Sequence, residues 1–248
     1  MQAFDYDNNT YSIREDIPEA FRSVWQTIAS PGNWWTGEDR VALAAESRAA
    51  RKCDFCSARK LALSPYNFKG EHHGVSNLPG VAIDAVHRIT TDASRITKQW
   101  ITKSAASGLS EEKYIELLGI VVAIISIDAF HRALGLPLET LPEPLAGEPS
   151  TYSPPGAKLN GAYIPTVTPA DLSDHEADLY GGAPQTGNVL SAMSLVPDSV
   201  RMLTTLGDAQ YLNMNDVPNP TTNGGRAISR PQIELIAGRV SSLSDCFY

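Results

Sequence analysis

An unbroken apolar segment in the middle of the chain restricts the possible folds more than any other feature. Residues 119–127 read Gly-Ile-Val-Val-Ala-Ile-Ile-Ser-Ile, so a helix formed by them is apolar on every side and needs other elements packed around it. The β-branched residues would also suit a strand. However, Glu111 and Glu112 before the segment and Gly135 after it are typical of helix ends. We therefore predict a buried helix over residues 110–135.

Capping signals and apolar spacing predict helices on both sides of this segment. Thr36 with Asp39, and Ser229 with Gln232, have the spacing of a capping box, which marks the start of a helix. The fold class that we predict is therefore all-α. Its helices are expected over residues 18–29, 37–63, from 80 onward, 110–135, 189–212 with an interruption near 197, and from 229 onward. The last of them carries one apolar stripe, formed by Ile233, Ile236, Val240, Leu243 and Phe247.

Charge and hydropathy exclude several classes of partner. The net charge of −8 provides no basic surface for a nucleic acid. The longest apolar stretch, residues 117–127, is about half of what a membrane span needs. The first nine residues lack the basic and apolar regions of a secretory signal. We therefore expect a cytoplasmic protein that binds neither nucleic acid nor membrane.

The three cysteines form one complete Cys-x-x-Cys and the beginning of another. Cys53 and Cys56 are the complete pair, and Cys246 would be paired by a residue at position 249. When the two motifs are aligned, residues 41–53 lie over residues 234–246, and both segments are small and apolar up to the cysteine. This predicts an internal duplication, with a first repeat over 1–135, a Pro/Gly-rich linker over 136–187 and an incomplete second repeat over 188–248.

A Cys-x-x-Cys at a helix start is suited to redox chemistry, because its sulfurs can close a disulfide and the helix dipole lowers a thiol pKa. The Ser-rich residues 241–245 favour a helix break just before Cys246. Glu234 stands twelve residues earlier, which is about 18 Å along a straight helix. Glu234 can therefore act on the Cys246 sulfur only if the chain bends back, and it could equally be an ordinary exposed residue.

Glu234 and Cys246 resemble the Glu-x11-Cys-x-x-Cys-x3-His signature of the alkylhydroperoxidase D / carboxymuconolactone decarboxylase superfamily. Residues 34–48, which lead to the first cysteine pair, and residues 108–116, which lead to the buried helix, resemble it too. The resemblance implies an alkylhydroperoxidase D-like helical fold and a thiol peroxidase that needs no cofactor or metal. Its second cysteine attacks the hydroperoxide, its first resolves the sulfenate, and its glutamate and histidine relay protons. A dithiol reductant and a homo-oligomer are implied as partners.

Some members of this superfamily carry selenocysteine at the attacking position. We therefore expect residue 249 to be selenocysteine, with the chain cut at its UGA codon and left inactive or weakly active. The codon that follows Tyr248 tests this expectation directly.

The first cysteine pair departs from the family pattern. Val41 stands where the glutamate belongs, and Lys60 stands where the histidine belongs. Glu46 is seven residues before Cys53, about 10 Å along a straight helix. Arg59 and Lys60 could lower the pKa of Cys56. The pair is thus a working dithiol, a degenerate site or a structural pair.

Three alternatives to a peroxidase stay open. The Cys53–Cys56 pair with His72 and His73 has the residue types of a zinc site, although adjacent histidines point apart in regular structure. The protein could instead be a redox-sensing helical partner. It could also be a cysteine-independent lactone decarboxylase of the same superfamily, although the cysteine pairs argue against that chemistry. His87 and His131 are predicted to be core or surface histidines rather than site residues.

Overall fold

A computed structural model describes residues 3–7, 9–244 and 246 of the chain. Over these residues the protein is all-α, with nine α-helices, two 3₁₀ segments and no strand. The predicted all-α class is confirmed. The α-helices are α1 (Asp16–Ala29), α2 (Gly37–Ala50), α3 (Asp54–Leu61), α4 (Gly80–Asp92), α5 (Lys98–Ala106), α6 (Glu111–Ala133), α7 (Asn188–Ser191), α8 (Pro197–Gln210) and α9 (Arg230–Leu243). The 3₁₀ segments are η1 (Ala93–Arg95) and η2 (Pro169–Asp171).

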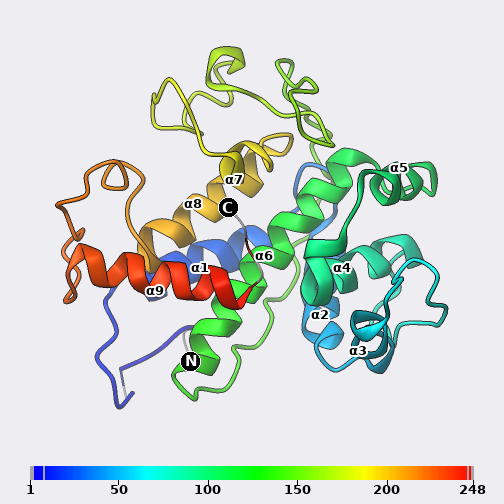
Figure 1. Ribbon diagram of the computed structural model, residues 1–248, viewed down its shortest axis with the longest axis horizontal. Coiled ribbons are helices and arrows are strands. Elements are labelled where there is room, and N and C mark those ends of the chain that lie inside the picture. The colour runs from blue at the N-terminus through cyan, green and yellow to red at the C-terminus, as the bar shows by residue number, and fades with distance from the viewer. Residues whose placement is uncertain (1–2, 8, 245, 247–248) are drawn as a thin grey trace.

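The predicted apolar helix is α6, and it runs through the centre of the molecule (Figure 1). It packs against α2 and α4 on one side and against α8 on the other, while α1 lies against α8. By length and composition α6 could cross a membrane, but 67% of its most apolar window is buried inside the protein. The Ser110 hydroxyl accepts the Lys113 N–H at its start, and Gly135 follows its end with φ +69°. Leu118, Val122 and Ile125 on the remaining face are half-buried, so most of the helix is covered and it needs few polar residues.

Both predicted capping boxes are confirmed. The Thr36 hydroxyl accepts the Asp39 N–H at the start of α2, and the Asp39 carboxylate accepts the Thr36 N–H. Ser229 and Gln232 make the same reciprocal pair at α9. Each box satisfies N–H groups that the first helical turn leaves free.

The predicted helix over residues 37–63 is wrong in one respect that matters for the site. It is divided into α2 and α3, and Cys53 between them has an extended backbone and caps the N-terminus of α3. Arg51 and Lys52 are both good helix formers, so the local sequence does not predict the break. The helix α5 was not predicted from the sequence; Thr97 caps it by accepting the Trp100 N–H.

The predicted linker, residues 136–187, is ordered along the surface. Backbone N–H groups of Leu145 and Ser150 bind carbonyls at the end of α1 and in the turn after it. An isolated antiparallel bridge joins Lys158 to Thr166. The buried side chains Ile164, Leu179 and Tyr180 of this segment belong to the same hydrophobic core as residues of α1, α2 and α4 to α8.

The apolar stripe of α9 is largely uncovered. Ile233 is buried, but Ile236, Val240 and Leu243 are exposed. The fifth predicted member, Phe247, lies outside the described residues.

Candidate functional site

The break between α2 and α3 brings the first cysteine pair into the interior. Cys53 and Cys56 are free thiols, and each is 1% exposed. Cys56 lies in the first turn of α3, which packs against α4. Both sulfurs therefore lie near the α3 N-terminus, where the helix dipole favours a thiolate.

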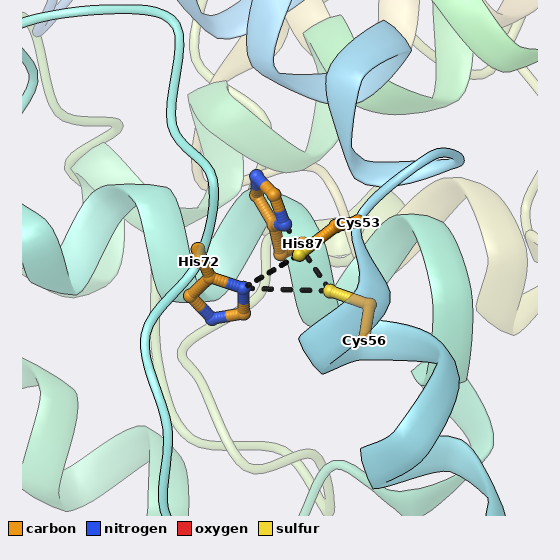
Figure 2. A group of neighbouring side chains, drawn as sticks. All are labelled: Cys53, Cys56, His72 and His87. Carbon is orange, nitrogen blue, oxygen red and sulfur yellow. Dashed lines mark hydrogen bonds between the residues drawn. The ribbon is translucent and has the colours of Figure 1, made fainter.

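Two histidines from other elements complete a four-residue cluster (Figure 2). His72 lies on the loop between α3 and α4, and its Nδ1 is 3.4 Å from Sγ of Cys56 and 3.8 Å from Sγ of Cys53. His87 is fully buried on α4, and its Nδ1 is 3.2 Å from Sγ of Cys56. One nitrogen or sulfur atom from each of the four residues lies within 4.8 Å of the other three.

A carboxylate holds the far nitrogen of each ring. Nε2 of His87 lies 3.2 Å from Oε2 of Glu46, on the buried face of α2. The other oxygen of Glu46 accepts the Val75 N–H and the Ser76 hydroxyl at 2.8 and 2.6 Å. Glu46 therefore fixes both the His87 ring and the end of the loop that carries His72.

Asp84 has the same role for His72. Its Oδ1 lies 3.0 Å from Nε2 of His72 and accepts Nη1 of Arg59 at 2.7 Å. Its Oδ2 accepts Nε of Arg88 at 2.8 Å. Arg59 also directs Nη2 toward Sγ of Cys56 at 3.8 Å. The sulfurs thus have two histidines and one guanidinium around them.

These contacts shift the pKa values of His72, Asp84 and Cys53. Burial alone would lower the pKa of His72, but Asp84 and the two sulfurs raise it to about 9. Burial would raise the pKa of Asp84, but His72 and the arginines hold it well below its usual range. Burial would also raise the pKa of Cys53, but the N–H groups of Cys56 and His73 and the His72 ring lower it to about 7. His72 is therefore the cation of the cluster.

In contrast to His72, His87 has a lowered pKa. Burial and the nearby His72 cation lower the pKa of His87, so its ring is neutral. Burial would raise the pKa of Glu46, but its bonds to Ser76, Val75 and His87 lower it. An ionised Glu46 accepts a proton-bearing Nε2, and this assigns the tautomer in which Nδ1 of His87 has a free lone pair toward Cys56.

The second predicted site is not assembled in the same way. Glu234 is bonded to the Tyr211 hydroxyl and to Nε of Arg230 at 2.7 and 2.5 Å. Cys246 is exposed beyond the end of α9, and no hydrogen bond joins it to Glu234 among the described residues. The predicted break before Cys246 agrees with the end of α9 at Leu243.

Two members of the first site, His87 and Glu46, were not predicted to belong together from the sequence. His87 was expected in the core, and it is buried, but its ring faces the sulfurs. Glu46 was placed about 10 Å from Cys53 along a straight helix, and in the structure it contacts His87 rather than a sulfur. Of the adjacent histidines, His72 enters the cluster and His73 is exposed.

No protein-family model matches the chain, and no curated protein or solved structure was found to be significantly similar to it.

Proposed function

We propose that the protein reduces hydroperoxides with the Cys53–Cys56 pair, which an external dithiol then regenerates. The observation that carries this proposal is the line of contacts from Sγ of Cys56 through the His87 ring to Glu46. A thiol beside an imidazole that a carboxylate orients is the general arrangement of an activated cysteine. The resemblance to alkylhydroperoxidase D implies the same three groups. In this proposal Glu46 and His87 replace those lacking at Val41 and Lys60.

The first step oxidises Cys56. Nδ1 of His87 accepts the thiol proton, and the thiolate attacks the terminal oxygen of the hydroperoxide ROOH. The O–O bond breaks, the sulfur takes the OH group as sulfenic acid, and the RO⁻ group leaves as the alcohol with the proton returned by His87. Sulfur loses two electrons and the peroxide gains them.

The second step closes a disulfide. The Cys53 thiol attacks the Cys56 sulfenic acid, an S–S bond forms, and the OH group leaves as water with the Cys53 proton. The two sulfurs lie within 4.8 Å of each other before reaction. An external dithiol then reduces the disulfide by exchange and is itself oxidised. His72 is the least buried of the four residues, so the peroxide is expected to enter beside it.

Peroxide consumption by the reduced, metal-free protein with a small dithiol tests this proposal. Cys56→Ser is expected to abolish turnover. Cys53→Ser is expected to allow one turnover and to leave a sulfenic acid on Cys56 that mass spectrometry detects. His87→Asn removes the proton acceptor and should lower the rate about 100-fold.

Cys246→Ser is the matched control and should keep the wild-type rate. Retention of the wild-type rate by Cys56→Ser would contradict the assignment, as would loss of activity in Cys246→Ser. Reduced wild-type protein that consumes no peroxide would overturn the function itself.

A further inference from the structure

We infer that Cys53, Cys56, His72 and His87 form a tetrahedral zinc(II) site. This site goes beyond the proposed peroxide chemistry and does not depend on it. It differs from the zinc site considered from the sequence, because His87 on α4 takes the place of His73 as the fourth ligand. Two sulfur and two imidazole ligands suit zinc by softness and by geometry.

The distances between the donor atoms support this assignment. Zinc bonds of about 2.3 Å to sulfur and 2.0–2.1 Å to nitrogen place tetrahedral ligand atoms about 3.3–3.8 Å apart. Three of the four sulfur–nitrogen separations are 3.2, 3.4 and 3.8 Å, and the fourth, from His87 to Cys53, is within 4.8 Å. All four donors are within 4.8 Å of one another, so small side-chain movements would close the sphere.

The carboxylates around the cluster are the second observation. A metal-bound histidine usually gives its other ring N–H to a carboxylate or carbonyl, which orients the ring and strengthens the ligand. Both histidines do this here, His72 with Asp84 and His87 with Glu46. In both rings it is Nδ1 that faces the sulfurs and Nε2 that faces the carboxylate.

Charge and burial also fit a closed structural site. Two thiolates and one zinc(II) ion sum to zero, and the carboxylates of Glu46 and Asp84 are offset by Arg59 and Arg88 beside Asp84. The cysteines and His87 are buried, and four protein ligands leave no open position on the metal. The ion would join α3, α4 and the loop between them.

Zinc binding and the peroxide reaction compete for the same sulfurs. If the pair is oxidised by ROOH, its two thiolates give two electrons to the O–O bond, and the peroxide oxygens take two protons from solvent. The products are the Cys53–Cys56 disulfide, the alcohol and water, and the ion is released because a disulfide is no longer a thiolate ligand. Zinc is therefore expected on the reduced pair and not on the disulfide.

Metal analysis of the reduced full chain tests the site without any peroxide. We expect about one zinc per chain after zinc is added and excess is removed, as a single four-ligand site requires. Cobalt(II) titration should give the intense visible and near-ultraviolet bands of tetrahedral thiolate ligation. The chelator-treated protein should lose protection from hydrogen exchange in residues 62–79.

The adjacent histidines provide a matched pair of variants. His72→Ala is expected to lower zinc affinity at least 10-fold, whereas His73→Ala should leave it unchanged. Reduced wild-type protein that retains no zinc and gives no thiolate–cobalt bands would overturn the site, and so would equal losses in both variants. Stoichiometric zinc in a protein that consumes no peroxide when metal-free would instead reject only the proposed function.

Discussion

Two buried glutamates show how the same residue type is adapted to opposite surroundings. Glu46 receives three hydrogen bonds, and these outweigh burial and lower its pKa. Glu116 on α6 is equally buried, but Arg40 and the Trp34 N–H offset its burial only in part, so its pKa is raised. The first carboxylate is set up to orient a histidine, whereas the second is half of an ion pair in the core.

The Arg40–Glu116 pair yields a prediction about stability. Nη1 of Arg40 donates to Oε1 of Glu116 at 2.5 Å, and both side chains are 1% exposed. Nε and Nη2 of Arg40 have no partner in the described part of the structure. Removing one buried charge leaves the other unpaired, so Arg40→Met should cost about 3–5 kcal/mol of unfolding free energy. Urea unfolding followed by circular dichroism measures this cost.

The double variant Arg40→Met/Glu116→Gln is the control for that cost. It has no uncompensated charge, and the glutamine oxygen can still accept the Trp34 N–H. Its stability is therefore expected to lie much closer to wild type than that of Arg40→Met. Equal stability of the single and double variants would show that lost packing, rather than the unpaired charge, determines the cost.

At the scale of elements, the close approach of α6 and α8 depends on Gly119. A Cβ atom at this position would lie 2.5 Å from Oγ and 2.7 Å from Cβ of Ser199. Alanine favours a helix over glycine by about 1 kcal/mol, but overpacking a core costs about 1–3 kcal/mol. Gly119→Ala should therefore destabilise the protein. Thermal and urea unfolding of the variant are the measurements.

Gly207 on α8 is the matched control, because a Cβ atom there meets nothing within 4 Å. Gly207→Ala should gain the propensity without the clash and stabilise the protein by up to about 1 kcal/mol. A stabilising Gly119→Ala would mean that α6 and α8 separate without cost.

Helix boundaries could be predicted from the sequence where neighbouring residues determine them. The helix starts at Thr36 and Ser229 depend on residues three positions apart, and the start at Ser110 was indicated by the glutamates that follow it, so local sequence was sufficient. The break before Cys53 was missed because Arg51 and Lys52 favour a helix, and its cause lies in the burial of the cysteines. Tertiary packing, which local spacing does not contain, decides such a position.

The composition of the candidate site depends even more on tertiary packing, and less of it could be predicted from the sequence. Residue types and the Cys-x-x-Cys spacing identified Cys53 and Cys56. The partners Glu46 and His87 are 41 positions apart and meet only because α2 packs against α4. A helical pattern cannot tell a histidine that fills a core from one that faces a sulfur, because both are buried. Only the packing of α3 on α4 distinguishes them here.

In the whole molecule, a single hydrophobic core includes residues from the predicted first repeat, the linker and part of the predicted second repeat. Buried side chains of residues 1–135, of the linker and of α7 and α8 belong to the same hydrophobic cluster. The helix α9 has one buried side chain, Ile233, and no residue of α9 belongs to this cluster among the described residues. The predicted first repeat, the linker and the helices α7 and α8 therefore share one core.

The uncovered face of α9 leads to a prediction about assembly. Leu235, Ile236, Val240 and Leu243 are between 55% and 74% exposed. Beside them Tyr211, Arg226 and Ile228 help to line a largely apolar cavity of ≈ 600 Å³. Exposed apolar surface of this kind is typical of a contact between proteins. The family resemblance implies a homo-oligomer, so we propose that a second copy of the chain covers this face. Sedimentation velocity over a range of micromolar concentrations should show concentration-dependent self-association.

Ile236→Lys/Val240→Lys should abolish this association, because it places two charges in the proposed interface. Since both side chains are exposed, the unfolding free energy of the monomer should change by no more than about 0.5 kcal/mol per position. Leu63→Lys is the control, because Leu63 is fully exposed just beyond the end of α3, away from α9. It should associate like wild type. A wild-type chain that stays monomeric throughout, or a Leu63→Lys variant that loses association equally, would remove α9 as the contact surface.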